Sequence, residues 1–187
     1  TGEYDGRGYS ISNLTIKRTS TQEVGLFGDT SGATIRNLGV TNDNITGNVQ
    51  VGSLVGLSYT TIIDNCSASG SVVASTSHTG GLVGYSYRDT IRNSYSTASV
   101  DVGSGNYIGG LVGYASDNST ILNSYSTGSV VTSSAFRGGL VGNKGGSTTI
   151  TDSFYDATTS GKSDTGRGTG KTTAEMKTLA TFTDTAT

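Results

Sequence analysis

Residues with the chemistry for catalysis are few in this chain of 187 residues. His78 is the single histidine, so acid–base catalysis or a histidine-based metal site would depend on it alone. It lies in the segment ASTSHTGG ahead of an apolar segment, where we expect a solvated loop residue. Cys66 has no second cysteine for a disulfide, and no base or orienting partner is indicated for a thiol nucleophile. Neither residue predicts a catalytic centre.

Carboxylates and a glycine-rich tail are the next candidates. Among the aspartates at positions 29, 43, 64, 89, 101, 117, 152 and 156, only Asp89 and Asp117 share a sequence context that places both near one turn. A calcium site needs several converging oxygens, whereas Asp117-Asn118-Ser119 is more typical of a capping turn. The segment GRGTGKTT lacks the phosphate-loop spacing, because Thr165 stands where the first glycine is required. We therefore expect no catalytic residue, no metal site and no cofactor.

Tyrosines are the candidates for ligand contact. Tyr85 and Tyr114 each follow an LVG triplet, and Tyr87 lies two residues beyond the first of them. Neighbouring rings on one face could hold a sugar ring by stacking, or they could cover the edge of the core. The sequence leaves both interpretations open for these possible ligand-facing aromatics.

Composition narrows the class of protein. Charged residues make up 14 % of the chain and the net charge is −2, which offers no broad basic surface for nucleic acid. No apolar run approaches the roughly 18 residues of a membrane helix. Serine, threonine and asparagine supply the polarity instead, which suits exposure to the external medium. We expect no nucleic-acid partner and no membrane span, and we interpret a chain that begins at Thr1 as an excerpt or a mature product.

A repeat of nearly constant length organises the chain. The triplet LFG or LVG ends at positions 28, 56, 84, 113 and 142, so successive copies lie 28 or 29 residues apart. A second mark, isoleucine two residues before asparagine, recurs with nearly the same period from Ile35 to Ile121. Two independent marks with one period indicate a repeat architecture rather than a single site.

Each repeat contains short apolar segments separated by Gly, Ser, Thr, Asn and Asp, which is typical of strands bounded by turns. A unit of about 28 residues cannot bury its own apolar face, whereas stacked coils bury it against each other. We therefore predict an all-β fold, a parallel β-solenoid of about five coils over residues 1–156. Residues 157–187 form a Gly/Thr-rich tail in which we expect a short capping helix.

Stacking predicts ladders of equivalent residues. The predicted ladder residues are the isoleucines Ile35, Ile63, Ile91, Ile121 and Ile150, the asparagines Asn37, Asn65, Asn93 and Asn123, and the aromatics Tyr95, Tyr125 and Phe154. We expect the isoleucines in the core and each asparagine amide donating to the next coil, since amide ladders stabilise stacked strands. Asparagine also tolerates the left-handed conformation of a tight corner.

Four segments match the Asn-x-Ser/Thr pattern of N-glycosylation, at Asn13, Asn44, Asn65 and Asn118. We expect Asn13 and Asn65 to be inaccessible, because both occupy positions of the predicted amide ladder. Asn44 and Asn118 are therefore the candidate glycosylation sites.

The repeats resemble a known family. GGLVGYSYRDTIRNSYSTASV, GGLVGYASDNSTILNSYSTGSV and GGLVGNKGGSTTITDSFYD are similar to the GLUG motif, which is named after its Gly-Leu-any-Gly core. The N-terminal YDGRGYSISNLTI resembles the first coil that commonly precedes such repeats, and GKSDTGRGTGKTTAEMKT resembles the segment that closes GLUG arrays. The resemblance implies a bacterial or archaeal surface or secreted protein, such as an adhesin-like chain or an immunoglobulin-A peptidase. It assigns no activity to the repeats themselves.

The two ends of the predicted solenoid differ. At the C-terminal end we expect a threonine N-cap at Thr172 or Thr173 and a short helical turn over the last coil. Its inner side is predicted to carry Met176, Leu179, Ala180 and Phe182. The N-terminal coil over residues 4–16 has no comparable cover, so adjacent domains or identical copies are expected to stack on it.

These features predict a non-catalytic extracellular repeat module of a cell-surface or secreted protein, acting in adhesion or as a structural stalk. The alternatives are a self-assembling extracellular fibre subunit and a carbohydrate-binding β-solenoid. Beyond the partners at the N-terminal coil, surface glycans or host proteins are the expected ligands.

Overall fold

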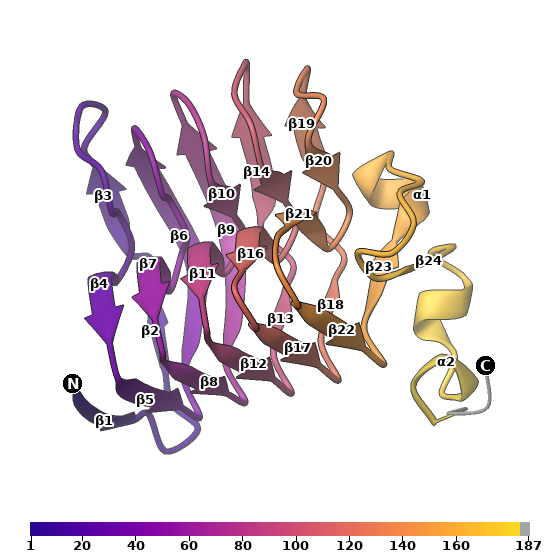
Figure 1. Ribbon diagram of the computed structural model, residues 1–187, viewed down its shortest axis with the longest axis horizontal. Coiled ribbons are helices and arrows are strands. Elements are labelled where there is room, and N and C mark those ends of the chain that lie inside the picture. The colour runs from indigo at the N-terminus through magenta and orange to yellow at the C-terminus, as the bar shows by residue number, and fades with distance from the viewer. Residues whose placement is uncertain (184–187) are drawn as a thin grey trace.

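The computed structural model describes residues 1–183 and is a parallel β-solenoid (Figure 1). Successive coils follow one another along the long axis, and β1 lies at the opposite end from α2. The predicted fold class is confirmed, because every pairing between the strands is parallel and equivalent strands of successive coils are neighbours.

Four sheets run along the solenoid. The isoleucine sheet contains β1 (Gly2–Asp5), β5 (Ala33–Arg36), β8 (Ile62–Asp64), β12 (Thr90–Arg92), β17 (Thr120–Leu122) and β22 (Thr149–Thr151). The LVG sheet contains β4 (Phe27–Ser31), β7 (Val55–Tyr59), β11 (Val83–Tyr87), β16 (Val112–Ser116) and β21 (Val141–Lys144). The short sheet contains β10 (Thr79–Gly80), β15 (Ile108–Gly109) and β20 (Arg137–Gly138).

The fourth and longest sheet closes each coil. It contains β2 (Ser10–Ser12), β3 (Thr15–Lys17), β6 (Gly39–Gly47), β9 (Ser67–Ala74), β13 (Tyr95–Ser96), β14 (Ser99–Val102), β18 (Tyr125–Ser126), β19 (Val130–Thr132), β23 (Phe154–Asp156) and β24 (Thr169–Lys171). One coil therefore passes through the LVG sheet, the isoleucine sheet, the long sheet and the short sheet in that order. The five strands of the LVG sheet mark five coils.

Strand register stacks equivalent residues, and the isoleucine sheet shows this most clearly. Ile63 pairs with Ile35 on one side and with Ile91 on the other, and the column continues through Ile121 to Ile150. The first four of these isoleucines are buried, whereas Ile150, in the last coil, is half-buried. Tyr4 takes the isoleucine place in β1, above Ile35.

Leucine and valine of each LVG triplet both point into the core. Leu82 and Val83 are fully buried because the chain bends at residues 81–82, between the short sheet and the LVG sheet. The glycine that follows is required by close packing. A Cβ atom at Gly84 would lie 2.5 Å from the backbone nitrogen of Val51 in the preceding coil.

A second glycine position is explained by the residue across the core. A side chain at Gly81 would overlap the Ser96 hydroxyl, and Gly110 and Gly139 stand in the same relation to a serine and a tyrosine of their own coils. In the preceding coil the larger of the two facing residues is on the other side. Ser53 replaces the glycine and Ala68 replaces Ser96. Volume is therefore balanced within each coil.

The first part of the predicted tail extends the solenoid by one strand. After α1 (Ala157–Ser160), strand β24 returns to pair in parallel with β23, so the long sheet extends past residue 156. The 3-10 helix η1 (Glu175–Lys177) and α2 (Ala180–Thr183) then complete the described chain. Within residues 1–183 no helix is long and apolar enough to cross a membrane.

Candidate functional site: the aromatic face and the two ends

The predicted asparagine ladder lies at the corner after the isoleucine sheet. Asn37, Asn65, Asn93 and Asn123 all have left-handed φ values between 48° and 54°. The Asn65 amide donates to the Asn37 side-chain carbonyl at 2.9 Å, and Asn123 donates to Asn93 at 3.4 Å. The ladder is interrupted between these pairs, because the Asn93 amide donates instead to the Asp64 carboxylate at 2.9 Å. The expectation that every asparagine bonds its neighbour is therefore wrong at Asn93.

The asparagine side chains are also more exposed than predicted. Asn13 and Asn65 are exposed, so the prediction that they are inaccessible is wrong. The left-handed corner turns the asparagine outward and the residue after it inward. Asn44 and Asn118 are exposed as well, so exposure does not separate the four sequons. Glycosylation at Asn44 and Asn118 stays a prediction.

The buried polar column is the one immediately after the asparagines. Ser94, Ser124 and Ser153 are buried there, with Cys66 in the same place one coil earlier. The N–H of Ser94 donates to the Ser124 hydroxyl at 3.3 Å, and that hydroxyl donates to the Leu122 carbonyl at 2.8 Å. Each small hydroxyl thus links two coils. Burial raises the pKa of the Cys66 thiol to about 11, which leaves it protonated and unreactive.

Two of the predicted ligand-facing tyrosines belong to an aromatic face, which we define as His78, Tyr85, Tyr107, Tyr114 and Phe136. Tyr85 and Tyr114 are register partners whose ring centroids lie 5.4 Å apart. Tyr107 stacks on Tyr114 at 4.7 Å, and Phe136 lies 5.3 Å from Tyr107. His78 joins the cluster 5.2 Å from Tyr85 and 5.0 Å from Tyr107.

The interpretation of His78 as a solvated loop residue is wrong. The residue is half-buried, and its Nδ1 atom is buried without a hydrogen-bond partner in the described chain. Burial lowers the pKa of its imidazole. The repeat pattern does not reveal this position, because the residue type differs in each coil. The equivalent residues are Gln50, Tyr107 and Phe136. Their position just before the short sheet is the signal that would have found them.

Tyr87 belongs to a separate stack. Its ring lies 4.7 Å from that of Tyr59 at an interplanar angle of 9°, and the Arg88 guanidinium lies 5.1 Å from its centroid. In both clusters the rings contact other aromatic rings, which fits the interpretation that they cover the edge of the core. Sugar binding by Tyr85, Tyr87 and Tyr114 stays a prediction.

Asp89 and Asp117 lie at the same corner of neighbouring coils but differ in burial. Asp89 is buried, with Oδ1 accepting the Thr61 N–H at 2.8 Å, whereas Asp117 is exposed at its turn. Burial raises the pKa of Asp89 to about 6, partly opposed by the Thr61 N–H. Among residues 1–183, no three His, Cys, Asp or Glu side chains gather in a way that could hold a metal ion.

At the C-terminal end, the tail pairs with backbone groups that a further coil would otherwise pair. The Asp164 carboxylate accepts the Gly139 N–H at 2.9 Å, a role that carbonyl oxygens of the next coil fill elsewhere. The Arg167 guanidinium donates to the Gly142 carbonyl at 2.6 Å and to the Arg137 carbonyl at 3.1 Å. Asp164 and Arg167 lie 3.6 Å apart as an ion pair. We call residues 161–171 the C-terminal cap.

The segment after this cap covers the side of the last coils. The Thr172 hydroxyl accepts the Glu175 N–H, and the Glu175 carboxylate accepts the Thr172 N–H at 2.7 Å, which forms a capping box. Phe182 lies 5.8 Å from Phe154, the last ring of a ladder in which Tyr95 and Tyr125 stack at 4.9 Å.

The inner side of this segment was predicted to carry four apolar residues. Met176 is buried, but Leu179 is 77 % exposed and Ala180 is exposed, so the prediction is wrong for these two. The 3-10 turn over residues 175–177 ends at Thr178, which is extended, and the chain therefore leaves the helical register on which the prediction rested.

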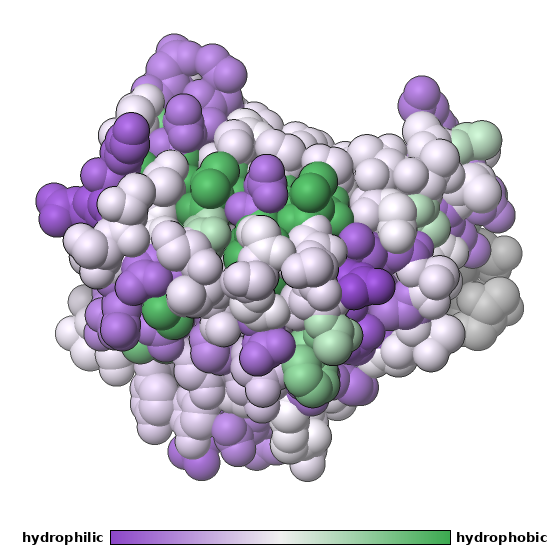
Figure 2. All heavy atoms as spheres, turned by 90° about the horizontal axis from the view of Figure 1, so that it is seen from above, coloured by the Kyte–Doolittle hydropathy of each residue, from purple (hydrophilic) through white to green (hydrophobic). Residues whose placement is uncertain are grey.

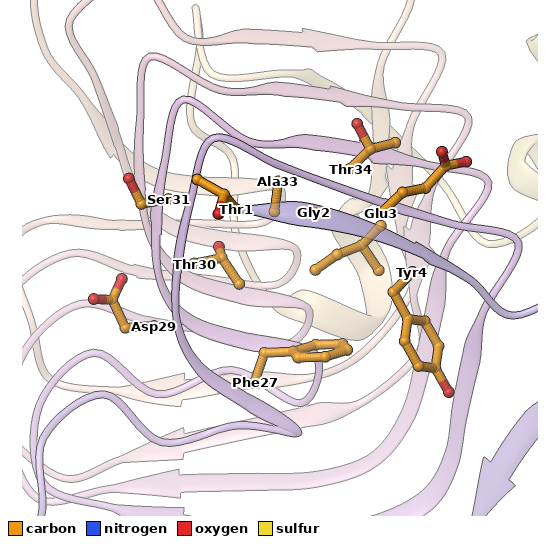
Figure 3. Close-up of a pocket in the computed structure, with 11 residues that line it drawn as sticks. Thr1, Gly2, Glu3, Tyr4, Phe27, Asp29, Thr30, Ser31, Ala33 and Thr34 are labelled. Carbon is orange, nitrogen blue, oxygen red and sulfur yellow. The ribbon is translucent and has the colours of Figure 1, made fainter.

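At the N-terminal end, the first coil is open. A cavity of about 250 Å³ lies between β1 and β4, lined among others by Tyr4, Phe27, Thr30 and Ile35 (Figure 3). The Tyr4 and Phe27 rings meet edge to face with centroids 5.4 Å apart. We call this cavity the N-terminal notch.

Comparison with known proteins assigns the repeats. The stacked parallel coils define a β-solenoid repeat protein. Residues 47–73, 75–101 and 104–131 match the family described as the GLUG motif, so these three repeats belong to the GLUG-motif family, as their sequence predicts.

A curated relative is similar to part of this chain. Halomucin of Haloquadratum walsbyi is 40 % identical over 111 residues, which cover 57 % of this chain and 1 % of halomucin. The chain therefore corresponds to a very small part of that relative's length. No solved structure matches the chain.

Proposed function

We propose that this chain is a non-catalytic structural module of a secreted or cell-surface protein, serving as a rigid stalk segment. The observation that carries the proposal is the use of side chains for stacking. Isoleucines, serines and tyrosines of one coil contact equivalent residues of the next. A column built in this way transmits force along its axis, because each coil is tied to its neighbours by backbone and side chains together.

Two observations support a location outside the cell. The repeats are similar to part of halomucin, and the chain carries only 14 % charged residues. In Figure 2 most of the surface seen from above is close to neutral in hydropathy, with hydrophobic atoms in small separate groups. Antibodies raised against residues 1–187 should label intact source cells or their medium. A signal found only after lysis would contradict this location.

The stalk role is tested by pulling on the chain. In single-molecule force spectroscopy, with the module held between two marker domains of known unfolding force, we expect one cooperative unfolding event. Neighbouring coils share ladders and backbone bonds, so they should give way together. Unravelling of single coils at low force would contradict the proposal.

The non-catalytic role is supported by the different surroundings of the two aspartates at one corner, since Asp89 is buried and Asp117, one coil further on, is exposed. We expect no turnover of peptides, uronides or neutral glycans by the purified chain. Turnover that is abolished by replacing a small set of aspartates would overturn this part of the proposal.

A further inference from the structure

The aromatic column of the long sheet ends at Tyr95. Tyr95 and Tyr125 are register partners, and their rings stack at 4.9 Å with an interplanar angle of 2°. On the other side the register partner of Tyr95 is Ser67, and the same column continues through Gly39 to Ser10. These three residues carry no ring. Within residues 1–183, the face of Tyr95 that is turned away from Tyr125 therefore stacks on no other aromatic ring.

A groove lies where the column of rings stops, and we call it the tyrosine groove. It has a volume of about 250 Å³ and is lined among others by Tyr95, Ser67, Asn65, Gly39 and Ser10. Pockets for drug-sized molecules occupy about 300–1,000 Å³, so this groove fits a single ring with its substituents. Within the described chain, none of its lining residues is charged, which favours a neutral ligand.

The asparagine ladder is interrupted at the same step between coils. In the two completed pairs, the side-chain carbonyl of one asparagine accepts the amide of the following coil, Asn37 from Asn65 and Asn93 from Asn123. Asn65 would accept from Asn93 in this pattern, but the Asn93 amide donates to Asp64 instead. No donor within residues 1–183 bonds Oδ1 of Asn65, so the groove contains an amide oxygen that is able to accept a hydrogen bond.

We propose that the tyrosine groove binds a neutral pyranose unit of a glycan. One side of a pyranose carries several C–H groups, which the negative face of an aromatic ring attracts. Stacked on the open face of Tyr95, such a unit would occupy the place of the missing ring over Ser67. Its hydroxyl groups would donate to Oδ1 of Asn65 and would exchange hydrogen bonds with the Ser67 hydroxyl.

The combination of one ring face with amide and hydroxyl groups is the reason for this choice of ligand. A purely apolar ring would cover the Asn65 carbonyl and leave it unpaired, which costs binding free energy. An anion would meet the same carbonyl with no cation among the lining residues. The site includes none of the tyrosines that the sequence predicts to face a ligand. It goes beyond the stalk role and holds whether or not that role is correct.

The test uses the full chain, produced in a host that adds no glycans, and four neutral probes, which are cellotetraose, laminaritetraose, mannotetraose and galactotetraose. We expect saturable binding of at least one probe by titration calorimetry, with one site per chain. Tyr95→Ala should weaken this binding about tenfold or more, whereas Tyr95→Phe keeps the ring face and should change it less than about twofold. Tyr59→Ala is the matched control, because Tyr59 is 42 % exposed and also stacks on one ring of a neighbouring coil. It should leave binding unchanged.

Two further variants keep the test independent of folding. Ser67 is the register partner of Tyr95, so Ser67→Tyr should stack a ring on Tyr95 and fill the groove. We expect this variant to lose binding and to melt no lower than the parent chain. Asn65→Gly removes the side-chain carbonyl while glycine tolerates the left-handed φ of 53°, and it should weaken binding several-fold.

Absence of saturable binding with all four probes would overturn the proposal. Binding that both Tyr95→Ala and Ser67→Tyr leave intact would also overturn it, because the sugar would then lie elsewhere on the chain. Loss of binding in Tyr59→Ala, with binding retained in Tyr95→Ala, would place the sugar at the stack of Tyr59 and Tyr87 instead.

Discussion

The two ends of the solenoid meet the same physical problem in different ways. A stack of parallel strands leaves unpaired N–H and C=O groups at its first and last coils, and such edges invite pairing with other chains. At the C-terminal end, β24 covers β23, and Asp164 bonds the Gly139 N–H. At the N-terminal end, β1 covers β5 but leaves β4 bare. We call the C-terminal end, where the tail covers β23 but not β21 or β22, the closed end, and the N-terminal end, where β1 covers β5, the open end.

The ion pairs at the two ends differ in how much of their side chains is exposed to solvent. The side chains of Asp164 and Arg167 are 7 % and 21 % exposed, whereas those of Glu3 and Arg36 are 54 % and 47 % exposed. A charge in contact with backbone and shielded from water contributes more to stability than an exposed pair, which solvent screens. The comparison teaches that the closed end is built from buried polar contacts, while the open end carries charges that matter little for folding.

The largest expected effect lies between the ends, at Asp89. Burial raises its pKa from 3.8 to about 6, so the folded state keeps a proton that the unfolded state has lost. Stability therefore falls as the pH rises from about 4 to about 6 and stays lower above that range. Asp89→Asn removes this loss, and at pH 7 it should raise the free energy of unfolding by up to about 3 kcal/mol, from about 1.4 kcal/mol per pKa unit.

The measurement is denaturant unfolding of both proteins between pH 4 and pH 7. The advantage of the variant should grow across this range, with the exposed Asp117→Asn as the control that shows no such growth. Amide hydrogen exchange in the same two proteins compares the core with the N-terminal end. The slowest core amides should slow further in Asp89→Asn, while those of the exposed strand β1, which we expect to exchange by local fraying, should not change. A variant that is less stable than the parent at pH 7 would contradict the role given to Asp89.

The second prediction compares the loss of one ion-pair residue at each end. Asp164→Ala removes the acceptor for the Gly139 N–H and the partner of Arg167, and it should cost about 2 kcal/mol of unfolding free energy. Glu3→Ala removes one exposed ion pair with Arg36 and should cost about 0.5 kcal/mol or less.

Self-association of the same two variants gives a second comparison of the ends. Loss of the Asp164 contact frees an edge group, so Asp164→Ala should also self-associate more than the parent chain in light scattering at equal concentration. Glu3→Ala should scatter like the parent. Equal costs in unfolding for the two variants, with no difference in scattering, would remove the distinction between a closed and an open end.

Much of the coil architecture follows from sequence periodicity. The LVG triplets and the isoleucines keep one spacing, and the structure pairs Ile63 with Ile91 and Tyr95 with Tyr125 in the register that this spacing predicts. Periodicity reports which residues are equivalent, but it does not report which way a corner turns. The positions of Asn65 and Cys66 recur with the same period, and only the backbone conformation at φ 53° turns the asparagine outward and the cysteine inward.

Contacts that do not repeat from coil to coil cannot be predicted from periodicity. Asp164 and Arg167 belong to no repeat. The resemblance of their segment to the one that closes GLUG arrays indicates where the array ends, but not which residues bond the last coil. His78 is missed for a related reason, because its column changes residue type in every coil. The N-terminal notch depends on where β1 lies relative to β4, which is a property of the assembled coils rather than of a motif.

The smallest expected effect concerns the aromatic residues outside the core. Phe182 is 44 % exposed at the closed end and contacts the rings of Tyr125 and Phe154 at 5.6 and 5.8 Å. Its truncation in Phe182→Ala removes part of a covered apolar surface and should cost about 1 kcal/mol. Tyr9 at the open end is 76 % exposed, so Tyr9→Ala should change the free energy of unfolding by less than about 0.5 kcal/mol. Thermal unfolding of the two variants under one set of conditions compares them, and a lower melting temperature for Tyr9→Ala than for Phe182→Ala would show that the tail does not stabilise the closed end.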